Sequence, residues 1–118
     1  MATPEFLNRI KDPQVYIEDQ YGHPQTHLMR AEYSPDLKQW IAFPTIVDVG
    51  NSTLLRYPED AWKEAMGNAI RTNNYISFGD DKEAALKYSS GGYKAGTPLE
   101  MDEEAFKEKY KRQNGRVE

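Results

Sequence analysis

The longest apolar stretch of the chain is interrupted by a proline, and this arrangement limits the folds that the chain can adopt. The stretch runs from Trp40 to Gly50 with the sequence WIAFPTIVDVG, and Pro44 stands at its centre. It is too short and too interrupted to cross a bilayer, which takes about 20 apolar residues in a helix. Its β-branched and aromatic residues favour a strand. Because proline lacks the amide donor of a β-ladder, Pro44 predicts an edge strand, or a bulge, that ends at this point.

The sequence on either side predicts further strands. Residues 26–33 alternate in polarity, and residues 34–38, SPDLK, supply turn chemistry. With residues 39–47 as the second strand, the pattern predicts a β-hairpin. After a turn at residues 49–52, residues 53–56 are expected to return as a third strand. The result would be a small antiparallel meander.

Two short helices are predicted after the meander. Residues 58–70 begin with a proline and acids typical of a first helical turn, and their apolar residues recur at helical spacing. A second helix is predicted over residues 82–89, with Asp80 or Asp81 as its N-cap. The link at residues 75–78 fits either a short strand or an extended connection. We therefore expect an α+β fold in which the hairpin packs on two helices.

The chain divides into three parts by this pattern. Residues 1–25 form an N-terminal arm with one brief helix, which Pro13 limits to about two turns. Residues 26–92 form the compact α+β domain. Residues 93–118 form an extended C-terminal arm with a charged helix over residues 102–112. Both arms are expected to bury little on their own and to gain order on a neighbouring molecule.

Composition limits the class of protein and of partner. The chain has 118 residues, enough for one domain with a core of its own. Its net charge of −4 provides no uniform field for a phosphate backbone, which argues against nucleic acid as the main partner. There is no cysteine, so disulfides and thiolate metal sites are excluded. No signal peptide or membrane segment is recognisable, so we expect a small soluble protein.

Residues able to carry chemistry have simpler explanations as structural residues. His23 and His27 have the spacing of a helical metal site, but Pro24 between them argues against a helix. The acids at residues 80–81 and 100–104 suit helix starts. The SSGGYK stretch at residues 89–94 follows a helix, whereas a phosphate-binding loop precedes one. We therefore predict no catalytic, cofactor-binding or metal-binding residue, and no enzymatic activity.

The aromatic residues are the better candidates for function. Trp40 and Phe43 lie on opposite faces of one strand, so either both faces of the sheet are covered or one ring is exposed. An exposed ring here would favour a protein contact, since aromatic residues are enriched at interface hot spots. The candidate interface comprises Tyr33, Trp40, Ile41, Phe43, Pro44, Tyr93, Lys94, Phe106 and Tyr110.

The order of motifs resembles a small domain of tailed bacteriophages. Such domains occur alone or appended to internal virion proteins and transglycosylase-like polypeptides. They have a strand ending in Pro-Thr-Ile or Pro-Thr-Val, an alanine-rich helix, an aromatic-ended link and a helix with an EA…Y motif. The matching residues are Pro44, Thr45, Ile46, Ala61, Ala65, Phe78, Glu83, Ala84, Ala85 and Tyr88. Where the family often ends the first helix with glycine, this chain has residues 72–74, TNN.

The resemblance implies a non-enzymatic structural protein of the virion, with no cofactor. Its partners would be capsid, neck or tail subunits, or other copies of itself in a symmetric assembly, bound through the arms and strand edges. It would be found in the virion, and in the host cytoplasm during assembly. The alternative is a soluble phage protein that modulates a host protein or a phage lytic enzyme through the Trp40 face. A third hypothesis, an enzyme or small-ligand binder, predicts a concave polar pocket around His27 or Lys94.

Overall fold

The computed structural model describes residues 3–113, which fold into helices and small, mainly antiparallel sheets. The α+β class expected from the sequence is confirmed. Residues 1–2 and 114–118, which belong to the two expected arms, lie outside the described part of the chain.

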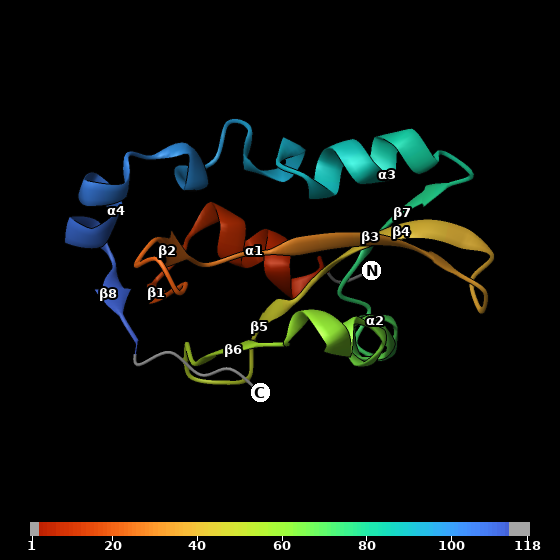
Figure 1. Ribbon diagram of the computed structural model, residues 1–118, viewed down its shortest axis with the longest axis horizontal. Helices are drawn as coiled ribbons and strands as arrows, with labels where there is room; N and C mark the ends of the chain where they lie inside the picture. Colours follow the sequence, from red (N-terminus) through yellow and green to blue (C-terminus); the bar gives the residue numbers. More distant parts are fainter. Residues whose placement is uncertain (1–2, 114–118) are drawn as a thin grey trace.

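A three-stranded antiparallel sheet lies at the centre of the molecule (Figure 1). Its strands are β3 (Met29–Ser34), β4 (Gln39–Pro44) and β7 (Ile76–Gly79), in the order β3-β4-β7. The first two form the expected hairpin, in which Tyr33 pairs with Trp40. The third is the link whose structure the sequence left open, and it forms a strand.

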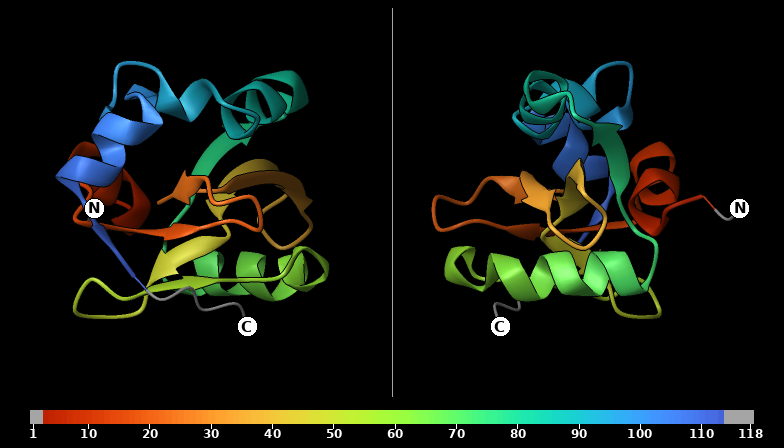
Figure 2. Two further views of the ribbon diagram at one scale, coloured as in Figure 1. Left: turned by 60° about the vertical axis from the view of Figure 1, so that its left-hand side comes forward. Right: turned by 90° about the vertical axis from the view of Figure 1, so that its right-hand side faces the viewer.

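The two expected helices cover opposite faces of this sheet, as Figure 2 shows. The helix α2 (Trp62–Arg71) buries Ala65 and Ala69 against Ile41 and Phe43. On the other face lies α3 (Lys82–Ser89), which packs against β3 and β4. Since both faces are covered, this central hairpin can hold apolar residues on each side.

Pro44 ends β4, but β4 is not an edge strand. Ile41 and Ala42 pair with β7 on one side and with β3 on the other, so the edge-strand prediction is wrong. β7 makes no pair beyond Ala42, however, so Pro44 stands where a missing amide costs no bond to β7. The chain then turns out of the sheet. The backbone N–H and the hydroxyl of Thr45 both donate to the Leu28 carbonyl, at 2.7 and 3.0 Å.

The third expected strand forms in a separate two-stranded sheet. β5 (Ile46–Asp48) follows Pro44 and pairs antiparallel with β6 (Leu54–Arg56). The turn between them begins at Gly50, whose φ of 123° is a conformation that favours glycine. The predicted meander is therefore divided in two, because the bend after Pro44 directs β5 away from β4.

A third sheet joins segments from the two ends of the chain. β1 (Val15–Glu18) pairs antiparallel with β2 (Pro24–Gln25) and parallel with β8 (Lys111–Arg112). The backbone N–H of Gln113 donates to the Tyr16 carbonyl at 2.8 Å, and its side-chain oxygen accepts from the Leu54 N–H at 2.9 Å. The C-terminal segment thus connects β1 with β6.

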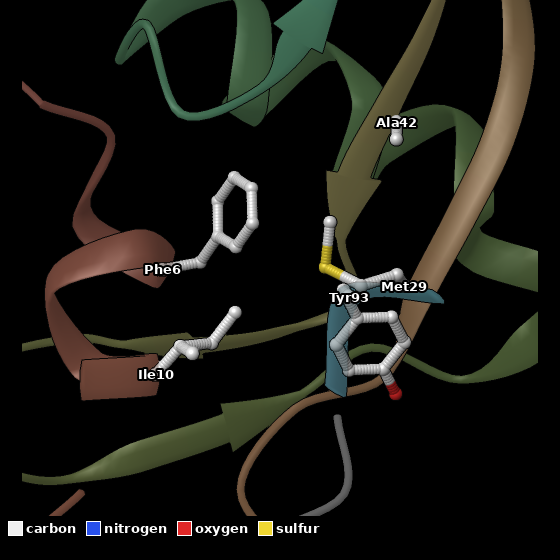
Figure 3. Close-up of a cluster of buried hydrophobic side chains, with 5 residues drawn as sticks. All are labelled: Phe6, Ile10, Met29, Ala42 and Tyr93. Carbon is white, nitrogen blue, oxygen red and sulfur yellow. The ribbon is translucent and has the colours of Figure 1, made fainter. Parts of the chain in front are cut away.

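The helix α1 (Glu5–Lys11) is part of the core. Phe6 and Ile10 point toward Met29 and Tyr93, with Ala42 nearby (Figure 3). Phe6 is 0% exposed. The expectation that the terminal arms bury little is therefore wrong. A two-turn helix with three apolar residues is too short for its pattern to reveal this packing.

Hydrogen bonds that involve polar side chains connect α1 to three other segments. The Phe6 N–H donates to Asn74 Oδ1 at 3.0 Å, and the Phe6 carbonyl accepts from His27 Nε2 at 2.8 Å. The buried guanidinium of Arg9 donates to the Ile46 carbonyl at 2.7 Å and also to the Thr26 carbonyl. These bonds connect α1 to the sheets over large sequence distances.

The C-terminal part folds over the same side of the molecule as α3. It contains the 3₁₀ turns η2 (Gly92–Lys94) and η3 (Pro98–Glu100), followed by α4 (Glu103–Lys109). The tail is therefore not extended, and the last helix ends before residue 112. Residues 111–112 pair with β1 as strand β8 instead, and Arg112 Nε lies 2.5 Å from Glu18 Oε1.

Candidate functional site

The nine residues proposed from the sequence as an interface do not form one surface. Five of them are buried by the chain itself: Ile41, Phe43, Pro44, Tyr93 and Phe106. Ile41 and Phe43 lie under α2, and Tyr93 packs in the cluster with α1. The expectation that these five residues contact a partner is therefore wrong for this fold. The chain needs their apolar surface for its own core.

Two of the nine remain together at the surface. Tyr33 and Trp40 face each other across the hairpin, with ring centroids 5.9 Å apart and the rings edge to face. Tyr33 is 45% exposed, and Trp40 is partly exposed. Lys82 Nζ of α3 lies 5.4 Å from the centre of the Trp40 ring. Trp40 thus lies on the α3 side and Phe43 on the α2 side, which confirms the predicted opposite faces.

Lys94 and Tyr110 lie apart from this aromatic pair, in the C-terminal part. The Tyr110 ring packs on Phe106 with centroids 4.6 Å apart and is only partly exposed. Lys94 is exposed, and its ammonium group lies 5.8 Å from the centre of the Tyr93 ring. The nine candidates thus separate into a buried set, the Tyr33–Trp40 pair and these two residues.

A polar pocket of about 230 Å³ lies between residues 23–28 and the C-terminal part. Its polar lining consists of His23, Gln25, Thr26, His27, Lys94 and Glu103. We refer to it as the His27 pocket. The hypothesis of an enzyme or small-ligand binder predicted a polar pocket at this place. The side chains that line the pocket show which chemistry it could support.

The imidazole of His27 is held in its neutral form. Its Nε2 lies 2.8 Å from the Phe6 carbonyl, which can only accept, so Nε2 carries the proton. Nδ1 therefore accepts from the Thr26 hydroxyl, 2.8 Å away. Burial, and then the charge of Arg9, lower the pKa of His27 to about 3. With both nitrogens engaged, His27 is not placed to act as a general base.

Other groups of the pocket are engaged in a hydrogen bond and an ion pair. The Tyr93 hydroxyl donates to the His27 carbonyl at 3.3 Å, and burial raises the pKa of Tyr93 to about 12. His23 Nδ1 lies 2.7 Å from Glu103 Oε1 at the exposed rim. The described part of the pocket therefore provides charges and hydrogen-bonding groups without an activated nucleophile.

The two histidines do not form a metal site together. His23 pairs with Glu103 at the surface, whereas His27 points inward to Phe6. Within residues 3–113, no group of three or more His, Cys, Asp or Glu side chains is placed to hold a metal ion. In the same range no helix has the length and apolar composition needed to span a bilayer.

A second pocket, of about 290 Å³, lies on the α2 side and was not predicted from the sequence. We refer to it as the Arg56 pocket. Its principal lining residues are Arg30, Thr45, Arg56, Tyr57, Glu59 and Trp62. They come from β3, the bend after Pro44, β6 and the segment that leads into α2. No local spacing connects them, so the sequence carried no signal for this site.

Comparisons with known proteins gave no match to any family model, curated protein or solved structure. The resemblance to the phage domain therefore rests on the motifs of the sequence itself. In the structure several of these motif residues are structural. Ala65 and Ala85 are buried, Thr45 fixes the bend after β4, and the Phe78 and Tyr88 rings lie 5.6 Å apart.

Proposed function

We propose that the chain is a non-enzymatic structural protein of a tailed-bacteriophage virion that binds neighbouring subunits of the capsid, neck or tail. The resemblance of its motifs to the phage domain supports the virion assignment. The Tyr33–Trp40 pair carries the proposal of protein binding, because it is an aromatic surface that the chain's own helices leave partly uncovered.

The position of this pair suits a protein contact. Trp and Tyr are the residue types most enriched at binding hot spots, since they bury much area at little entropic cost. Lys82 beside Trp40 adds a cation that favours an acidic or carbonyl-rich partner surface. Tyr33 of this pair lies on β3, a strand with a free outer edge in the described sheet, where a partner can add backbone hydrogen bonds.

The test is the composition of purified particles of the phage that encodes the chain. Wild-type particles should contain the protein, and the double variant Tyr33→Ala, Trp40→Ala should reduce its incorporation about tenfold or more. Tyr21→Ala is the matched control, because Tyr21 is an aromatic residue that is 76% exposed in the turn between β1 and β2. This turn lies far from the hairpin end (Figure 1).

Two outcomes would contradict the proposal. Particles without any copy of the chain would exclude a virion protein. Equal incorporation of both variants would exclude the Tyr33–Trp40 pair as the contact. If particles lack the chain but an infected-cell lysate yields one stoichiometric partner that depends on Trp40, the alternative of a soluble phage-encoded modulator replaces the proposal.

A further inference from the structure

Arg56 is an arginine whose side chain has no partner in the described part of the chain. It is partly buried on β6, and its Nε–H is enclosed without an acceptor. No hydrogen bond or ion pair of its guanidinium occurs among residues 3–113. Enclosing an unpaired donor of a charged group is unfavourable, because the group loses its hydrogen bonds to water without gaining a new acceptor. Each buried polar group without a partner calls for an explanation, and an acceptor supplied by a bound ligand provides one.

A second guanidinium lines the same pocket and is already oriented. Arg30 Nε donates to Glu32 Oε2 at 2.7 Å, and the guanidinium carbon lies 4.8 Å from the centre of the Trp62 ring. Stacking on the indole and pairing with Glu32 hold the group in one plane. Only one of the five N–H groups of Arg30 is engaged by this bond. The others are able to bind an anion.

The charge balance of the pocket selects the kind of anion. Glu59 lines the pocket with the two arginines, and Glu32 is bonded to one of them. Asp19 is a further acid near Arg56: its pKa is lowered chiefly by the hydrogen bond from the His23 backbone N–H and least by the charge of Arg56. Together the two arginines and these three acids carry a net charge of −1, so each further negative charge adds repulsion. A carboxylate suits this balance better than a phosphate dianion does.

The size and position of the pocket indicate how the carboxylate is presented. At about 290 Å³ the pocket lies at the lower end of the range for small-molecule sites, about 300 to 1,000 Å³. A single side chain fits this space. The pocket is also next to β3, whose outer edge is free among the described strands. A segment that pairs with this edge would place alternate side chains beside Arg30, on the face that carries Trp62.

We propose that the Arg56 pocket binds the carboxylate of an acidic side chain, presented by an extended segment of a partner protein that lies along β3. Arg56 binds the carboxylate through two parallel N–H bonds, and Arg30 binds it from the Trp62 side. This proposal depends on the proposed protein-binding function for its partner. It adds the chemical identity of the recognised group.

The test uses the full chain and a peptide of defined charge. The probe is acetyl-Thr-Val-Glu-Val-Thr-amide, and the matched probe has Gln in place of Glu. The readout is the NMR signal of the arginine Nε–H groups, which reports directly on Arg56 and Arg30. The Glu peptide should shift both signals saturably, and the Gln peptide should bind at least about tenfold more weakly. Inorganic phosphate should also bind more weakly than the Glu peptide.

Variants separate recognition by Arg56 from a general effect of charge. Arg56→Gln should weaken the Glu peptide at least about tenfold. Arg56→Lys keeps the charge without the planar fork and should weaken it by an intermediate factor. Arg71→Gln is the control, since Arg71 is an exposed arginine of α2 that bonds Asn68. It should leave the affinity unchanged.

The proposal is overturned by any of three results. These are the absence of a shift of the Arg56 signal at millimolar Glu peptide, equal binding of the two peptides, and equal losses in the Arg56 and Arg71 variants. Failure of the virion proposal gives a different result. The chain would then be absent from particles, while the purified protein still discriminates between the two peptides.

Discussion

His27 shows at the residue scale how burial determines protonation. Its pKa is about 3 in the fold, against 6.5 for an ordinary histidine. The unfolded chain therefore binds one more proton than the folded chain between these two pH values. The free energy of unfolding must fall as the pH is lowered from 6.5 toward 3. The loss is at most about 1.4 kcal/mol per pH unit from this residue.

The matched variant for this effect is His27→Gln, which keeps an amide near the Phe6 carbonyl and cannot be protonated. Between pH 7 and pH 4.5, wild type should lose about 2 kcal/mol more than the variant. Urea unfolding at the two pH values measures the difference. Parallel losses in both proteins would mean that His27 is already protonated in the fold, contrary to its hydrogen bonds.

The sequence could not reveal this state of His27, although it singled out the residue. The position of a histidine in a strand-like segment says nothing of which carbonyl its ring meets. Here the partner, Phe6, belongs to a helix that precedes it by many residues. The two arginines of the Arg56 pocket were missed for the same reason, because they lie on two separate strands, β3 and β6.

At the scale of elements, local sequence patterns correctly predicted most of the features that depend on local sequence alone. The apolar stripe of α2 and the turn of the hairpin are where we expected them. Asp81 caps α3, with its Oδ1 accepting from the Ala84 N–H at 3.0 Å. Most errors concern the partners of elements, and β8 was also missed because residues 111–112 were expected in a helix. The strand before Pro44 was recognised, but its pairing with β7 depends on the path of the chain after α2.

The docking of α1 on the core can be tested at this scale by the exchange of its amide hydrogens. An arm without contacts would exchange its amide hydrogens within the time of mixing, whereas a core helix is protected by the stability of the whole fold. We expect the amides of Leu7 to Ile10 and those of β4 to exchange with similar free energies of opening. Hydrogen exchange followed by NMR measures both in one sample.

A single substitution provides the complementary measurement. Phe6→Ala should lower the free energy of unfolding by about 3 to 5 kcal/mol, since the side chain is fully buried. Leu7→Ala on the same helix is the control, because Leu7 is only partly buried, and it should cost less. Fast exchange in α1 together with a negligible effect of Phe6→Ala would mean that α1 is not docked on the core.

At the scale of the whole molecule, the C-terminal end of the described chain links two of the sheets. Gln113 is bonded to β6 by its side chain and to β1 by its backbone. Gln113→Ala removes only the side-chain bonds and should lower the free energy of unfolding by about 1 to 2 kcal/mol. The control is Gln14→Ala, since Gln14 is exposed and contributes only its backbone carbonyl to Lys111. Equal costs of the two substitutions, measured by urea unfolding, would contradict this role.

The parallel pairing of β1 with β8 also affects how the protein folds as it is made. β1 leaves the ribosome well before β8, because most of residues 3–113 lie between the two strands. At roughly 5 to 20 residues per second, this interval lasts several seconds. For most of this interval Phe6 and Ile10 lack the Tyr93 side of their cluster, and one edge of β1 stays unpaired until β8 forms. The nascent chain is therefore most exposed to chaperones and proteases before its C-terminal segment emerges.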